Sequence, residues 1–190
     1  RKALLIPGHQ SGIVAHTHDA VTAIFRIAHR IYEKLPSFLR VPTTTSSANE
    51  IVFSHGGRIR VTTAGSDSFR GQTYDSLLLS EFASYTDAVE AMAAILQTAT
   101  PNAEVVLETT AKGLNHAYDL WLDPQGYGRV FLSWRLDPTC RLDHLPRNVT
   151  MTASVLDYGG QHNLSEPELN WVAAILQTKC GGNWQIFHQE

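Results

Sequence analysis

The feature that most constrains the fold of this chain is the alternation of short apolar segments with segments that repeat apolar residues at helical spacing. A short apolar run bounded by turn residues is typical of a buried strand, and apolar residues at positions i, i+3, i+4 and i+7 are typical of an amphipathic helix. Because strands that alternate with helices favour a parallel sheet, the sequence predicts an α/β domain with a mainly parallel sheet flanked by helices. The predicted strands cover residues 3–6, 76–79, 104–107 and 129–134, and the predicted helices cover residues 19–34, 86–98, 115–122 and 165–178.

One pair of segments predicts a hairpin. Residues 50–54 and 58–63 alternate apolar and polar side chains on either side of Gly56 and Gly57. Glycine adopts positive φ without strain, so the two glycines suit a tight turn between antiparallel strands.

The length and composition of the chain limit the classes of protein it can be. Its 190 residues are enough to bury one sizeable core, so we expect a single domain, with residues 137–163 as the least regular part. A hydrophobic share of 43% and a charged share of 17% are ordinary for a globular protein, and no apolar stretch is long enough to cross a membrane. Fifteen Lys and Arg against eighteen Asp and Glu give a net charge of -3, so any contact with a polyanion such as DNA must be local. Because the chain begins at Arg1 and enters an apolar segment at once, we expect it to be part of a longer protein.

A carboxylate follows the most apolar of the predicted strands. Leu77, Leu78 and Leu79 lead into Ser80 and Glu81. Since the ligands of α/β sheets bind outside the carboxyl ends of the strands, we expect Glu81 where a nucleotide could bind. A carboxylate there can orient a water for attack on a γ-phosphate. The alternative is a solvated glutamate at a strand end, which is the commoner situation when the motif is taken alone.

Hydroxyl-bearing residues follow the next predicted strand. Glu108 is followed by Thr109 and Thr110, and the polar segment continues to Asn115. Because parallel strands bring their carboxyl ends to one edge of the sheet, we expect the two threonines at the same edge as Glu81. The alternative is ordinary turn and capping chemistry, for which Thr, Gly and Asn are the usual residues.

These motifs, in this order, resemble the ATPase domain of phage terminase large subunits. The resemblance extends over nearly the whole chain, although no single motif is diagnostic. It implies a P-loop NTPase-like fold of the additional-strand, catalytic-glutamate type, incomplete in these residues. The resemblance rests on residues 70–75 (Arg-Gly-Gln-Thr-Tyr-Asp), residues 77–83 (Leu-Leu-Leu-Ser-Glu-Phe-Ala) and residues 107–113 followed by 118–121. Residues 32–36, 130–134 and 187–190 match more weakly.

The resemblance implies a role for individual residues. Glu81 matches the catalytic carboxylate at the end of the Walker B strand, and Ser80 stands where many relatives have the Asp that holds the shell of the Mg²⁺ ion bound with ATP. Arg70 matches an arginine that acts as a finger toward a neighbouring subunit's nucleotide or that contacts DNA. The alternative for Arg70 is a loop arginine paired with Asp67 or Asp75. The residues that match the nucleotide-sensing or coupling motif are Thr109, Thr110, Lys112, Gly113 and Asn115.

The resemblance also implies a function for the intact protein. It would hydrolyse ATP to move double-stranded viral DNA into a capsid, as a homo-oligomeric ring with a portal protein and a terminase small subunit as partners. Its location would be the cytoplasm of the infected bacterial host and, transiently, the procapsid. The phosphate-binding motif Gly-x-x-x-x-Gly-Lys-Ser/Thr (Walker A) does not occur in the sequence, and we expect it before residues 3–6. With a nuclease domain expected beyond Glu190, the chain is read as a partial ATPase domain that is inactive by itself.

Other interpretations remain open. A non-catalytic ATPase-like module would use this fold for assembly or DNA binding, with Ser80 marking lost metal binding, and another P-loop DNA translocase or helicase would share the strand-end carboxylate. His16 and His18 could bind a metal but have no third ligand at useful spacing. Ser80 with His116 or His144 could form a hydrolase triad, but no Gly-x-Ser-x-Gly elbow surrounds the serine. The four tryptophans are interpreted as core residues rather than as stacking platforms for bases: Trp121, Trp134, Trp171 and Trp184.

Overall fold

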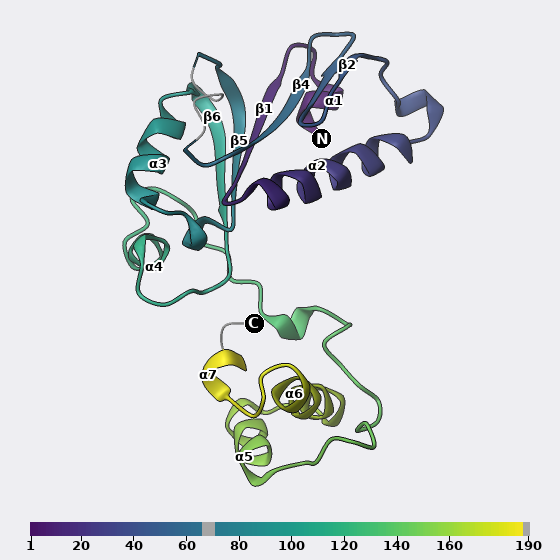
Figure 1. Ribbon diagram of the computed structural model, residues 1–190, viewed down its shortest axis with the longest axis vertical. Coiled ribbons are helices and arrows are strands. Elements are labelled where there is room, and N and C mark those ends of the chain that lie inside the picture. The colour runs from purple at the N-terminus through teal and green to yellow at the C-terminus, as the bar shows by residue number, and fades with distance from the viewer. Residues whose placement is uncertain (66–70, 188–190) are drawn as a thin grey trace. The chain divides into compact units, whose positions relative to one another are not determined.

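The computed structural model describes residues 1–65 and 71–187 of the chain. The chain divides into two compact units, Arg1–Asp123 and Pro124–Glu190, whereas its length favoured one (Figure 1). Each unit has its own hydrophobic core. Among the described residues, no helix combines the length and the apolar character that crossing a membrane requires.

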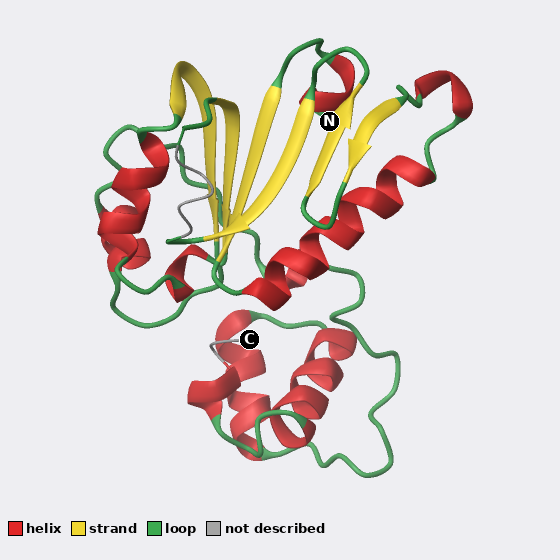
Figure 2. Cartoon of the chain, turned by 45° about the horizontal axis from the view of Figure 1, so that its top comes forward, coloured by secondary structure: helices red, strands yellow, loops and turns green. Residues whose placement is uncertain are grey.

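The first unit is built on a sheet of six strands in the order β2-β3-β4-β1-β5-β6. Figure 2 shows the strands of this sheet in yellow. The strands β4, β1, β5 and β6 pair in parallel, and β3 and β2 extend the sheet in antiparallel fashion beside β4. Helices flank this sheet, so the predicted α/β class is confirmed, as is the hairpin, which is β3 and β4. The strands are β1 (Gln10–Ala15), β2 (Thr43–Ser46), β3 (Glu50–Phe53), β4 (Arg58–Thr63), β5 (Tyr74–Ser80) and β6 (Ala99–Glu108).

All four predicted helices are present, as α2, α3, α4 and α6. Helix α2 begins after Thr17, whose side chain accepts a hydrogen bond from the Ala20 amide at 3.2 Å. One turn apart, Val21 and Phe25 are buried in the core of the first unit. The helices are α1 (Lys2–Leu5), α2 (His18–Glu33), α3 (Ala88–Leu96), α4 (His116–Leu122), α5 (Ala153–His162), α6 (Glu166–Thr178) and α7 (Trp184–Phe187), with short 3-10 turns η1 (Ser37–Leu39), η3 (Phe82–Ser84) and η4 (Trp134–Leu136).

The first predicted strand is wrong. Residues 3–6 fall mainly in helix α1, and the strand in this part of the chain is β1, which the sequence analysis missed. β1 is less apolar, but it pairs with β4 on one side and with β5 on the other. A run of four apolar residues does not distinguish a strand from a helix by periodicity, so strand pairing decided which segment entered the sheet.

The predicted strand at residues 129–134 is also wrong. These residues form no strand, and Val130, Phe131 and Leu132 are 76–78% exposed. β-propensity reports how well a side chain fits a pleated, half-buried surface, and that surface must be supplied by a neighbouring strand. The segment belongs to the second unit, whose described elements are helices.

The stretch at residues 137–163, expected to be the least regular, contains helix α5. Its Gly159 and Gly160 lower helix propensity, which is why the sequence pattern concealed it. The structure gives a packing reason for the first of them, since a Cβ on Gly159 would lie 2.4 Å from Cδ1 of Leu169 on α6. The glycine therefore allows α5 and α6 to approach closely.

The second unit packs α5, α6 and α7 around its own apolar core, whose fully buried members include Val155 and Val172. The rings of Trp134 and Trp171 stack with their centroids 4.9 Å apart. Trp184 packs against the same core, so three tryptophans behave as predicted. Trp121, in α4, does not, because it is 43% exposed.

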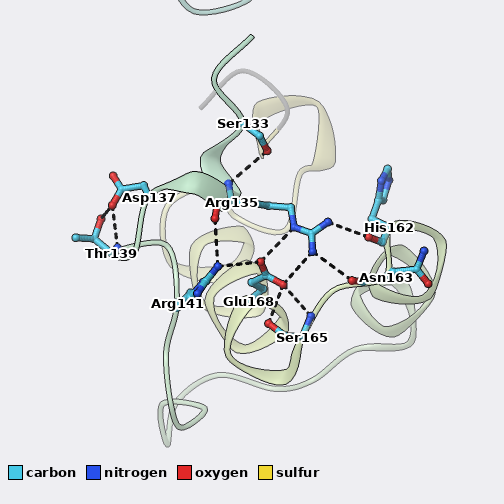
Figure 3. A network of polar contacts seen from close by, with 9 residues as sticks. All are labelled: Ser133, Arg135, Asp137, Thr139, Arg141, His162, Asn163, Ser165 and Glu168. Atoms are coloured by element: carbon cyan, nitrogen blue, oxygen red, sulfur yellow. Dashed lines mark hydrogen bonds and ion pairs between the residues drawn. The ribbon is translucent and has the colours of Figure 1, made fainter.

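Glu168 holds the start of α6 through a polar network (Figure 3). Its carboxylate accepts hydrogen bonds from the backbone amide of Ser165 at 2.8 Å and from the Ser165 hydroxyl at 2.7 Å. Nε of Arg135 donates to the same carboxylate at 3.1 Å, and Nη2 of Arg141 lies 3.6 Å from it. The Ser165 bonds, followed by the Arg135 bond, lower the pKa of Glu168 to about 2.

This lowered pKa predicts an acid sensitivity of the second unit. Stability that depends on ionised Glu168 is complete above the ordinary carboxyl pKa of 4.5 and is lost as the pH falls toward about 2. We expect Glu168→Gln to lower the free energy of unfolding near neutral pH by about 2 kcal/mol, because bonds to a charged acceptor are lost. It should also flatten the acid limb of the stability curve.

Urea unfolding followed by tryptophan fluorescence measures this effect, since three of the tryptophans lie in the second unit. The matched control is Glu166→Gln, which changes an exposed carboxylate in the same turn. Equal urea midpoints for the two variants would show that the network does not stabilise the unit.

Candidate active site

Glu81 directly follows β5 and has a left-handed backbone conformation, with φ 55° and ψ 43°. β5 lies between β1 and β6, and its Leu77 and Leu79 are buried, so the end of the strand is firmly held. The next residue, Phe82, is 1% exposed and contacts the ring of His116 edge-on, with centroids 5.9 Å apart. A left-handed backbone conformation costs a residue other than glycine about 1 to 2 kcal/mol. Glu81 is therefore a strained residue between a firmly held strand and the buried Phe82. Strained residues of this kind are common at functional sites.

The loop after β6 holds the backbone of Ala83 at both of its polar groups. Oγ1 of Thr109 accepts from the Ala83 amide at 3.0 Å, and the side-chain amide of Asn115 donates to the Ala83 carbonyl at 3.2 Å. We call these two bonds the Ala83 clamp. Asn115 also caps α4, because its Oδ1 accepts from the amides of Ala117 and Tyr118 at 3.1 and 3.2 Å. The clamp thus connects the segment that follows Glu81 to the first turn of α4.

The remaining residues of the predicted coupling motif lie in the same loop. Nζ of Lys112 donates to Oγ of Ser84 at 3.2 Å. Thr110 is exposed, and its carbonyl accepts from the Thr109 hydroxyl at 3.0 Å. Gly113 has φ +69°, which a residue with a side chain rarely adopts. Of the five predicted residues, three therefore contact the segment after Glu81 and two shape the loop.

Ser80 is hydrogen-bonded to a carboxylate that the sequence analysis did not select. Its hydroxyl donates to Oε2 of Glu108 at 2.9 Å, and the two residues are partners in the parallel register of β5 and β6. The available signal was the position of Glu108 at the end of a predicted strand, level with Ser80. Glu108 supplies beside Ser80 the negative charge that a serine lacks.

Tyr85 ties the end of β1 to the same region. Its hydroxyl donates to the Val14 carbonyl at 2.8 Å, and its side chain is buried. Burial raises the pKa of Tyr85 above its ordinary range, and the nearby charge of Glu108 raises it further. The hydroxyl therefore stays protonated and remains a donor.

Arg70 and Asp67 lie outside the residues that the structure describes. The predicted alternative partner of Arg70, Asp75, accepts a hydrogen bond from the Gln10 amide at 2.9 Å and lies 4.0 Å from Nδ1 of His9. The two roles expected for Arg70 therefore stay predictions.

A cavity of about 370 Å³ lies at the carboxyl ends of β1 and β4, next to α3. Its described lining includes Val14, Thr63 and Glu90 but neither Glu81 nor the loop at 109–115. Glu81 therefore lies outside the described lining of this cavity, at the carboxyl end of β5. Within residues 1–65 and 71–187, no three His, Cys, Asp or Glu residues are grouped so that they could hold a metal ion.

Comparison with known proteins gives both a family and a fold. A family model described as the N-terminal part of the T4likevirus-type terminase large subunit matches residues 2–136. The large terminase ATPase domain of Thermus phage P74-26 is similar at 24% sequence identity, over 64% of this chain and 55% of that one, with a TM-score of 0.50. The large terminase of bacteriophage HK97 is similar at 16% identity, over 98% of this chain and 40% of that one, with a TM-score of 0.56. At these identities the two structures show the fold, and this chain spans roughly half of the proteins it matches.

Proposed function

This chain belongs to the T4likevirus-type family of terminase large subunits, and from that membership we propose that it forms part of an ATP-hydrolysing motor that moves double-stranded viral DNA into a capsid. The observation that carries the proposal is the strained Glu81 at the end of β5, joined through the Ala83 clamp to the loop after β6. A nucleotide motor needs a group that promotes hydrolysis and a neighbouring element that moves with the state of the nucleotide. In this proposal Glu81, at the end of β5, is the group that promotes hydrolysis, and the loop after β6 is the element that moves.

Glu81 is assigned the role of the catalytic carboxylate. It would accept a proton from the attacking water while the water oxygen bonds to the γ-phosphorus of ATP and the bond to ADP breaks. The left-handed backbone of Glu81 ends β5, and buried Phe82 holds the turn that follows. The proposed base is thereby pre-positioned.

Mg²⁺ is proposed as the metal that accompanies ATP. When bound, it neutralises charge on the phosphates. Ser80 and Glu108 fit this ion, because Mg²⁺ takes oxygen ligands and is usually held by one or two carboxylates together with phosphate oxygens and water. The Gly-x-x-x-x-Gly-Lys-Ser/Thr loop that would complete a phosphate site is not in the sequence, so tests of activity require the full-length gene product.

Asn115 is proposed as a positioning residue that acts through Ala83. Asn115→Asp keeps an oxygen to cap α4 but removes the donor to the Ala83 carbonyl. Because a small displacement of a catalytic group costs much of its effect, we expect kcat for ATP hydrolysis to fall by about tenfold to a hundredfold, with little change in KM.

The matched control for this prediction is Asn183→Asp, since Asn183 also accepts from a helix N-terminal amide, that of Gln185, in the second unit. Steady-state kinetics of the two variants and far-UV circular dichroism distinguish positioning from loss of fold. A kcat equal to that of the control would contradict the role of the clamp.

The wider assembly follows from the family as part of the same proposal. The motor would work as a homo-oligomeric ring with a portal protein and a terminase small subunit, in the host cytoplasm and on the procapsid. A nuclease domain would belong to the full-length gene product. Arg70 would serve as an arginine finger or as a DNA contact.

The neutral Ser80 favours a second candidate, a non-catalytic ATPase-like module for assembly or DNA binding. ATP hydrolysis by the full-length gene product, with and without linear duplex DNA, separates the two. Hydrolysis that DNA stimulates supports the motor. Absence of hydrolysis under both conditions rules the motor out and leaves the module.

A further inference from the structure

Helix α2 carries three basic residues in one line on its outward side. Arg26, Arg30 and Lys34 are spaced four residues apart, and all three are exposed. At 3.6 residues per turn they run along the helix for about 12 Å, on the side opposite the buried Val21 and Phe25. We call these three residues the α2 stripe.

The charge of the α2 stripe is not neutralised by its surroundings. In the described parts of the chain, no carboxylate forms an ion pair with any of the three. Glu33, the nearest acid in sequence, lies instead 3.4 Å from Nδ1 of His29. Asp19, the other acid of the helix, is about 10 Å from Arg26 along the helix axis.

Arg40 adds a fourth cation at the end of the helix. Its guanidinium donates to the carbonyls of Glu33 and Leu35, which folds the following segment back toward the last turn of α2. Residues 26–40 therefore contain four of the fifteen Lys and Arg residues of the chain and one of its eighteen acids. This short region has a net charge of +3 in a chain whose net charge is -3.

An exposed line of positive charge on a protein of negative net charge favours an extended polyanion as its partner. Duplex DNA carries one negative charge for about 1.7 Å of its axis when both strands are counted, so each strand has about three to four phosphates along a stripe of 12 Å. Arginine and lysine supply many of the contacts to phosphates, and such contacts carry no sequence information. We propose that the α2 stripe binds the phosphate backbone of double-stranded DNA without sequence preference. The inference rests on the proposed function, because the DNA is the duplex that the proposed motor moves.

Ile27 and Ile31 allow a test of whether the α2 stripe acts through its charges alone. They adjoin the α2 stripe and are 58% and 61% exposed. A protein partner would bury these apolar side chains together with the charges, whereas a phosphate backbone would use the charges alone. Variants at the two isoleucines therefore test whether binding of the duplex uses the charges alone.

The experiment is a fluorescence-anisotropy titration of a labelled duplex oligonucleotide with the full-length gene product, without nucleotide, over a series of salt concentrations. The stripe variant is Arg26→Gln, Arg30→Gln and Lys34→Gln, in which glutamine keeps a helix propensity close to that of the residues it replaces. A second variant, Ile27→Gln with Ile31→Gln, removes the apolar side chains. The charge-matched control is Arg1→Gln, Arg147→Gln and Lys179→Gln, all exposed positions outside α2.

We expect the stripe variant to bind at least about tenfold more weakly near 0.1 M salt and to lower the slope of log K against log salt by about 2 to 3, for two unrelated duplex sequences alike. The isoleucine variant and the charge-matched control should bind as the wild type does.

Equal affinity and slope for the stripe variant and its control would overturn the inference while leaving ATP hydrolysis, and hence the motor, untouched. Weakened binding of the duplex by the isoleucine variant would overturn a contact made through the phosphate backbone and the charges alone. A wild type that neither binds duplex nor hydrolyses ATP would overturn the inference and the proposed function together.

Discussion

Glu81→Gln is expected to lower kcat for ATP hydrolysis by the full-length gene product by about a thousandfold, the middle of the range that a positioned general base contributes. Glutamine keeps the shape of the side chain but cannot take a proton from water. Glutamine also adopts the left-handed backbone conformation of this position about as well as glutamate does. The melting temperature should therefore stay within a few degrees of the wild-type value. The drop in rate should therefore appear in a protein that is folded.

The matched control for this prediction is Glu104→Gln. Glu104 is an exposed carboxylate on the neighbouring strand β6, and its partner is Lys2 at 2.7 Å. A phosphate-release assay on both variants, with and without linear duplex DNA, measures the effect. Hydrolysis by the Glu81 variant at the rate of the control would show that another group activates the water.

Gly57→Ala is expected to destabilise the first unit by about 3 kcal/mol, at the upper end of the usual cost of overpacking. A Cβ on this buried glycine would lie 2.1 Å from the carbonyl oxygen of Ala3 and 2.6 Å from Cε1 of His55. His55 itself contacts the Leu4 carbonyl at 2.9 Å, so the turn between β3 and β4 is held closely against α1. The backbone oxygen cannot turn aside as a long side chain can, so the turn or α1 must move.

The contrasting variant is Gly128→Ala, because a Cβ there meets no atom within 4 Å and the glycine does not have positive φ. Urea unfolding followed by far-UV circular dichroism compares the two. If both variants unfold at the wild-type urea concentration, then α1 does not constrain the turn in solution.

Patterns within single segments were sufficient for much of the fold. The periodicity of α2, the alternation of β3 and β4 and the capping residues Ser165 and Glu168 each report a local preference that survives in the folded chain. Among the strands predicted from short apolar segments, residues 76–79 and 104–107 lie in β5 and β6, whereas the predictions at residues 3–6 and 129–134 failed. Such a run records a tendency to be buried or to be extended but not the availability of a neighbouring strand.

The region of the candidate site was predictable because parallel topology is a simple rule. Once β5 and β6 are neighbouring parallel strands, Glu81 and Thr109 must emerge at one edge of the sheet. The contacts within that edge were not predictable. The bond from Ser80 to Glu108 and the two bonds on Ala83 depend on register and loop conformation, which no spacing in the sequence records.

The sequence by itself determined the α/β class, the family of the chain and the strand end on which its chemistry is proposed, because each rests on residue types in a fixed order. Only the tertiary structure determined that β1 pairs with both β4 and β5, that the chain divides into two units and that Glu108 stands beside Ser80. It also showed that Arg26, Arg30 and Lys34 share an exposed face. The physical reason is that pairing, packing and exposure are relations between distant segments, and their free energies arise only when those segments meet.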